Sequence, residues 1–109
     1  MTQPRRIDFA GAEPVSHDSG VHDREREVDG TRWALVEYAP GAGRAEWCDA
    51  PHTGFVRAGT LTYEFEDGRD PLTLHAGDGF VLPPRPRHRG RNDGTQPVEL
   101  FIVDALPGG

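Results

Sequence analysis

The chain has 109 residues, of which 35% are hydrophobic, and a formal net charge of −6. This length predicts a single domain, and its 14 glycines and 10 prolines argue against a helical bundle, because both residues interrupt helices. The single cysteine, Cys48, excludes an internal disulfide framework, and the lack of lysine excludes Schiff-base chemistry.

The first part of the chain is polar and interrupted by prolines and glycines. We interpret residues 1–30 as an N-terminal arm, in which Ile7 and Phe9 alternate as in a short edge strand. The strongly charged stretch 21–29 is typical of the outward half of a strand that ends at an Asp-Gly turn.

The remainder of the chain predicts a series of short strands. Residues 31–38 alternate in polarity and precede a Pro-Gly break, and residues 54–68 are typical of a hairpin whose first turn residue is Gly59. Residues 71–84 predict two short strands around a glycine-rich turn, and residues 97–105 predict a last strand. About eight short strands at this spacing indicate an all-β sandwich or barrel.

Four potential metal ligands fall in two groups, Glu46, Cys48 and His52 in one and His88 in the other. Residues two apart on an extended chain point to the same side, so Glu46 and Cys48 would project together. His52, four residues after Cys48, would point to the same side if the chain stays extended. A carboxylate, a thiolate and imidazoles are ligands of Zn²⁺, Fe²⁺ and neighbouring metals. From spacing alone this signal is weak, because polar loops often contain such residues.

Two spaced patterns frame these ligands: Gly41-x4-Glu46-x-Cys48-x3-His52-x6-Gly59 and Gly77-x5-Pro83-x-Arg85-x2-His88-x3-Asn92. They resemble the two motifs of the cupin superfamily. The resemblance implies a small cupin fold, a double-stranded β-helix or jelly-roll barrel over residues 31–105, with 1–30 as the arm and 106–109 as a C-terminal tail. It also implies a divalent metal ion.

The chain departs from the family pattern at three of the four ligand positions. Glu46 and Cys48 stand where the family has histidines, His52 stands where it has a glutamate, and only His88 keeps the family identity. Each replacement is itself a competent ligand, so we expect all four to bind the ion. Two anionic ligands would make a site with a dication neutral, which weakens activation of bound water. The thiolate favours Zn²⁺ or Fe²⁺, with Ni²⁺ or Mn²⁺ as further candidates.

Two classes of function follow from the resemblance, and the sequence leaves both open. One is a metal-dependent enzyme of the dioxygenase, isomerase or lyase type, acting on a small molecule in the barrel. The other is a non-catalytic ligand-binding module or a metal or redox sensor, because four protein ligands would leave a tetrahedral ion no open position. A barrel that has lost its metal is the third alternative.

Partners and location are also predicted. No excess of positive charge suggests nucleic acid, no apolar stretch approaches the ~20 residues that cross a bilayer, and residues 1–8 lack a secretory signal. We therefore expect a cytoplasmic bacterial protein without a nucleic-acid or membrane partner. Residues 1–30 could cover an exposed strand edge of a second copy, which predicts a homodimer. Asn92 is expected to fasten its loop, and His17 is expected in solvent unless the arm folds over the barrel mouth.

Overall fold

The computed structural model describes residues 3–105, which form strands joined by turns and loops. The strands are β1 (Val15–Ser16), β2 (Val21–Val28), β3 (Thr31–Tyr38), β4 (His52–Ala58), β5 (Thr60–Phe65), β6 (Leu72–His75), β7 (Gly79–Leu82), β8 (His88–Arg91) and β9 (Val98–Ala105). The prediction of an all-β protein is therefore confirmed. Within this described range, no helix has the length and apolar character needed to span a bilayer.

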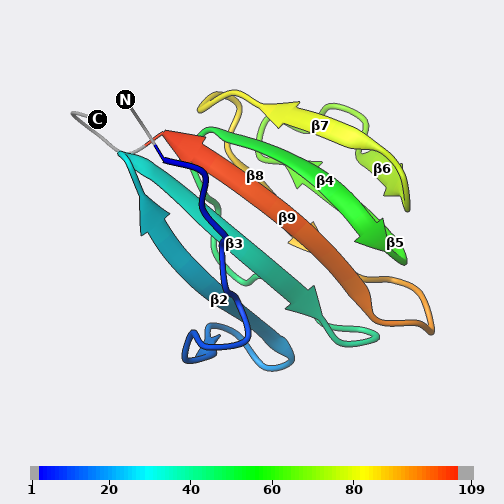
Figure 1. Cartoon of the computed structure of the whole chain (residues 1–109). Coiled ribbons are helices and arrows are strands. Elements are labelled where there is room, and N and C mark those ends of the chain that lie inside the picture. Colours follow the sequence, from blue (N-terminus) through cyan, green and yellow to red (C-terminus); the bar gives the residue numbers. More distant parts are fainter. Residues whose placement is uncertain (1–2, 106–109) are drawn as a thin grey trace.

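The strands form two antiparallel sheets around a common core. The larger sheet has the order β1-β2-β3-β9-β4-β7, and the smaller one has the order β6-β5-β8. In Figure 1 the long strands β2, β3, β9 and β4 run side by side, with β5 and β8 behind them. Because side chains alternate along a strand, each sheet presents one row of every strand to the interior between the sheets.

The interior is apolar over most of its length. On β3 and β9 the paired residues Ala34 and Ile102, and Val36 and Leu100, are all buried, which confirms the alternation predicted for both segments. They pack against Val98 of β9 itself and against buried residues of the other strands, namely Val21, Val56, Leu61, Tyr63, Leu74, Phe80 and Leu82.

The same inward-facing rows become charged at one end of the large sheet. Arg32 of β3 is the register partner of Asp104 of β9, two residues beyond the buried pair Ala34 and Ile102. His52, the first residue of β4, lies beside them and contacts Asp104. The fold therefore joins an apolar core to a polar end, and the candidate site lies where the two meet.

The predicted hairpin over residues 54–68 is wrong. β4 pairs with β7 and β9, whereas β5 pairs with β6 and β8, so the chain crosses from one sheet to the other at Gly59. Gly59 has a φ of 79°, and a Cβ there would lie 2.4 Å from the carbonyl oxygen of Pro97. A glycine required at a tight corner therefore produced the same sequence signal as a hairpin turn. The turn between β6 and β7 is where predicted.

The N-terminal segment differs from its prediction in two respects. Ile7 and Phe9 form no strand, and the Phe9 ring instead packs against Phe101, with centroids 5.6 Å apart. The stretch 21–29 does form β2, which pairs along its whole length with β3, but it is not only outward-facing, because Asp23 is 4% exposed. The domain boundary at residue 30 stays a prediction, and the predicted tail 106–109 lies outside the described residues.

Candidate metal centre

Cys48 and His88 are brought together by the main chain. The loop before β4 lies against the start of β8, and the two residues form an isolated antiparallel bridge. The Cys48 N–H donates to the His88 carbonyl at 2.8 Å, and the His88 N–H donates to the Cys48 carbonyl at 3.0 Å. The two side chains therefore start from paired backbone positions.

Asn92 holds this loop in place, as the sequence predicted. Its side chain is 1% exposed and donates to the carbonyl oxygens of Tyr38, Ala39 and Gln96 at 2.8–3.2 Å. Its own backbone carbonyl accepts from the N–H of Gly41. The end of β8 is thus tied to the beginning of the loop that carries Cys48.

His52 reaches the site from the large sheet. Its Nδ1 lies 2.8 Å from Oδ2 of Asp104, and its ring stands edge-on to the His88 ring with centroids 5.3 Å apart. Residues 49–51 belong to no strand, so the parity of an extended chain does not by itself account for the approach of Cys48 and His52.

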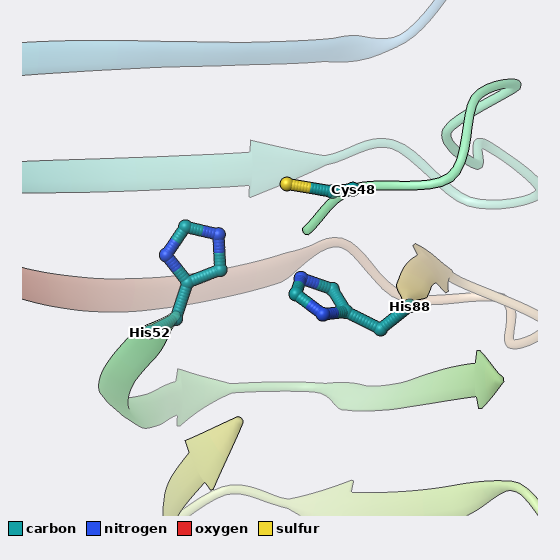
Figure 2. Close-up of side chains that lie close together, drawn as sticks. All are labelled: Cys48, His52 and His88. Carbon is teal, nitrogen blue, oxygen red and sulfur yellow. The ribbon is translucent and has the colours of Figure 1, made fainter. Parts of the chain in front are cut away.

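The ligand atoms of Cys48, His52 and His88 all lie within 4.8 Å of one another. Figure 2 shows the three side chains pointing toward one another, with a ring nitrogen of each histidine turned toward the sulfur. His88 is 2% exposed, and the other two are partly buried. Three ligand types typical of Zn²⁺ and Fe²⁺ thus converge from three segments of the chain.

Electrostatics favour the thiolate form of Cys48. Hydrogen bonds from His52, the largest effect, and from His88 lower the pKa of Cys48 to about 5 despite partial burial. The Ala50 N–H adds a donor 3.4 Å from the sulfur. Burial lowers the pKa of His52, but Cys48 and Asp104 outweigh it and raise that pKa above its usual value. The sulfur is therefore unprotonated at neutral pH, the form in which cysteine binds metals.

Glu46 does not join these three residues. Its side chain is exposed and lies outside the cluster, although it lines the same cavity. The structure thus brings three of the four predicted ligands together, and a role for Glu46 as the fourth stays a prediction. A dication held by one thiolate and two neutral imidazoles would carry a net charge of +1 rather than zero.

The three ligands stand on the wall of a cavity of about 90 Å³ inside the barrel. Tyr38, Tyr63 and Leu100 contribute to its walls, and Asp23 and Arg32 supply charges. The cavity therefore combines apolar and aromatic surface with a few polar groups, as ligand sites usually do.

Asp23 is a cavity residue that the sequence analysis missed. Its Oδ2 lies 3.1 Å from His17 and 3.5 Å from Arg32, whereas its buried Oδ1 has no hydrogen-bond partner among residues 3–105. Burial raises the pKa of Asp23 more than the hydrogen bond from His17 lowers it. The sequence signal that could have identified Asp23 is its position two residues after the buried Val21, which places both side chains on the same face of β2.

Two other charged residues near the cluster were also missed. Arg32 pairs with Asp23, Glu25 and Asp104, and Asp104 continues the inward row after Ile102. His17, Asp23 and Glu25 also offer ligand atoms within 4.8 Å of one another. The Arg32 guanidinium already supplies positive charge to both of those carboxylates, so this group is an ion-pair network rather than a second candidate centre.

The chemistry of the donor set fits a divalent metal ion. The Cys48 sulfur is ionised at neutral pH, and the Asp104 carboxylate engages Nδ1 of His52, which leaves Nε2 for the cluster. The His88 Nδ1 is buried without a hydrogen-bond partner in the described part of the chain. Thiolate and imidazole are both zinc ligands, and three protein ligands are the usual number at catalytic zinc sites.

Comparison with other proteins concerns the fold that carries these residues. Residues 34–104 match the sequence profile of the cupin domain family. No curated protein matches the chain. At identities of 13–17% with the solved structures below, the likeness concerns the fold.

Three solved structures illustrate that likeness. The polyketide cyclase RemF from Streptomyces resistomycificus superposes with a TM-score of 0.79 at 13% identity, over 96% of this chain and 81% of that one. A sugar phosphate isomerase from Silicibacter pomeroyi gives 0.73 at 16%, over 94% and 76%. An RmlC-like cupin from Shewanella frigidimarina gives 0.73 at 17%, over 98% and 96%.

Proposed function

Since the chain belongs to the cupin domain family, we propose that it binds a divalent metal ion through Cys48, His52 and His88 and acts on a small molecule in the barrel cavity. The observation that carries this proposal is the convergence of the three ligand atoms within 4.8 Å at the cavity wall. The jelly-roll barrel predicted from the two motifs is the fold that the family and the solved structures share.

Zn²⁺ or Fe²⁺ is the proposed metal, with Ni²⁺ or Mn²⁺ less favoured, because the thiolate is a soft ligand. When bound, such an ion supplies a Lewis acid and lowers the pKa of a coordinated water. The protein's own contribution is to hold Cys48 ionised, to orient His52 through Asp104, and to surround the site with Tyr38 and Tyr63.

An enzyme of the dioxygenase, isomerase or lyase type is favoured over a closed structural site. Three protein ligands leave a tetrahedral ion one open position, which is typical of catalytic rather than structural zinc. A polyketide cyclase and a sugar phosphate isomerase with this fold support a small-molecule enzyme. Asp23 lines the cavity and supplies a carboxyl group that favours a substrate able to form hydrogen bonds.

A non-catalytic metal or redox sensor is the second candidate. The observation in its favour is the pKa of Cys48, lowered to about 5, because thiolates react readily with oxidants and metals. Coordination separates the two candidates: an ion with a replaceable water favours an enzyme, and an ion closed by Glu46 as fourth ligand favours a sensor.

Elemental analysis tests the metal site directly. Protein purified without a metal-affinity column and then incubated with Zn²⁺ or Fe²⁺ should retain about one ion per chain, and Cys48→Ser should retain much less, because the thiolate is lost. His22→Ala, a histidine exposed on the sheet surface, is the control and should retain the ion. Wild-type protein that retains no ion would refute the proposal.

Glu46→Gln decides the number of ligands. Full metal retention in this variant, with a Co²⁺ spectrum that changes on addition of azide, supports three protein ligands and an open position. Lost metal supports Glu46 as the fourth ligand and the sensor alternative.

The homodimer and the cytoplasmic location remain part of the proposal. Residues 15–16 and 21–28, expected to cover a partner's edge, pair within their own chain. Phe55 and Val81 are 45% and 71% exposed on the outer face of β4 and β7, which supports contact with a second copy. Light scattering during size-exclusion chromatography should give twice the mass of the monomer, and the mass of a monomer would refute the dimer.

A further inference from the structure

We propose that Asp104 is a positioning residue for His52, which keeps a proton on Nδ1 and thereby leaves Nε2, on the side of Cys48 and His88, as the nitrogen that a metal ion would bind. This inference rests on the proposed metal site but concerns a residue outside the ligand set.

The contact between the two side chains is direct and shielded. Oδ2 of Asp104 lies 2.8 Å from Nδ1 of His52, and their side chains are 13% and 15% exposed. An ionised carboxylate can only accept a hydrogen bond, so Nδ1 must donate. A neutral imidazole carries one proton, and when that proton is on Nδ1 the lone pair is on Nε2.

Asp104 is itself fixed from two sides. Its Oδ2 also accepts a hydrogen bond from Nη1 of Arg32 at 3.2 Å, and its Oδ1 accepts one from the backbone N–H of Thr53 at 3.3 Å. Because both oxygens are engaged, the carboxylate cannot rotate away from His52. The Arg32 guanidinium, the register partner of Asp104 on β3, also compensates its charge.

The position of the proton matters because a metal ion binds the nitrogen that lacks it. An imidazole without such a partner distributes the proton over both nitrogens, and part of the population presents the wrong one. Partners of this kind are typically worth about 10–100-fold in metal affinity. No other side chain in the described part of the chain forms a hydrogen bond with Nδ1 of His52.

The test compares Asp104→Ala with Glu37→Ala. Glu37 holds Nε2 of His22 at 2.9 Å in a similar histidine–carboxylate pair, but on the exposed surface. Zn²⁺ affinity is measured by competition with a chromophoric chelator, and circular dichroism verifies that each variant folds. Asp104→Ala should weaken Zn²⁺ binding about 10–100-fold, and Glu37→Ala should leave it unchanged.

A second readout does not involve metal. In metal-free protein carrying Cys48→Ser, which lacks the thiolate that accepts a hydrogen bond from His52, ¹⁵N shifts of the neutral ring distinguish a protonated from an unprotonated nitrogen. We expect a protonated Nδ1 in Cys48→Ser alone and a mixture of both tautomers when Asp104→Ala is added. A merely structural role for Asp104 would not move this signal, and the signal remains decisive if the wild type binds no Zn²⁺.

Asp104→Asn covers the case in which the alanine variant does not fold. The N–H groups of Thr53 and His52 both point at this side chain, and an amide accepts hydrogen bonds only through its oxygen. One of the two N–H groups therefore faces the NH₂ group of the asparagine, and Zn²⁺ affinity should fall by less than about 10-fold. The inference is overturned if the folded variant binds Zn²⁺ as tightly as the wild type and its His52 keeps Nδ1 fully protonated.

Discussion

The ligands on the two sides of the site are held by different kinds of bond. Cys48 and His88 start from residues that the main chain pairs directly, through two backbone hydrogen bonds of 2.8 and 3.0 Å. His52 comes from a separate sheet, and a side chain, Asp104, determines its ring orientation. The first arrangement depends on the path of the chain and the second on individual side chains, so mutations should affect the two sides differently.

His52 and His88 also differ in what holds their rings in place. Nδ1 of His52 is paired with a carboxylate, whereas Nδ1 of His88 is buried and has no hydrogen-bond partner among residues 3–105. Tyr63 packs edge-on against the His88 ring, with centroids 5.5 Å apart. Packing, backbone pairing and the contact with the Cys48 sulfur therefore orient His88, whereas a carboxylate orients His52.

The largest expected effect concerns the side of the site that the backbone holds, which carries Cys48 and His88. Asn92→Ala removes the donor from three carbonyl oxygens and should lower the free energy of unfolding by about 3 kcal/mol. Urea denaturation measures the loss, and Thr95→Ala, exposed in the same loop, should cost little. The ¹⁵N signal of His52 should stay unchanged in the folded variant, and a shift to mixed tautomers would show that the two sides are not independent.

The second prediction concerns the thiolate. With the pKa of Cys48 at about 5, the sulfur is fully ionised well below pH 7. The rate of alkylation by iodoacetamide in metal-free protein should therefore rise less than about 2-fold between pH 7 and 8.5, whereas an unperturbed thiol rises roughly 20-fold.

His52→Ala sharpens this result. It removes the hydrogen bond that lowers the pKa of Cys48 most, so alkylation should become dependent on pH in that range. His22→Ala should behave as the wild type. A steep rise in the wild type would contradict an ionised Cys48.

The smallest effect concerns Asp23. Burial raises the pKa of this carboxyl above its usual value in the folded state, so ionisation is less favourable there than in the unfolded chain. The protonated Asp23 carboxyl therefore stabilises the folded state fully at a pH below the pKa that Asp23 has in the unfolded chain. This stabilisation is lost as the pH rises through the pKa that Asp23 has in the folded protein. Asp23→Asn cannot ionise, so it should gain stability relative to the wild type as the pH rises from about 3 toward neutrality. Urea denaturation at a series of pH values measures this gain.

Asp93→Asn, at an exposed residue, changes the net charge equally and serves as control. A stability difference between Asp23→Asn and the wild type that does not change with pH would contradict the raised pKa of Asp23.

Much of the fold could be predicted because alternation depends only on neighbouring residues. The strands around Val36 and Leu100 are clear in the sequence, and the paired motifs implied the cupin barrel. Strand pairing was less accessible: Gly59 indicates a turn, but not whether the next strand returns to the same sheet or crosses to the other.

The site was predicted in part for a similar reason. Ligand chemistry and the family resemblance pointed to Cys48, His52 and His88, which the structure brings together, but the exposure of Glu46 depends on the course of a loop. Asp23 and Asp104 reach the site only through the pairing of distant strands. Parity placed both on inward rows, yet an isolated carboxylate in a charged segment usually faces solvent.

The position of β2 has a consequence for specificity. Its register with β3 is set by main-chain pairing, and it precedes residues 34–104 that carry the family pattern. Asp23 nevertheless contributes to the cavity wall. A substitution there would change the cavity wall without touching the segments that carry Cys48, His52 and His88, so the lining of the cavity could change while these three side chains stay in place.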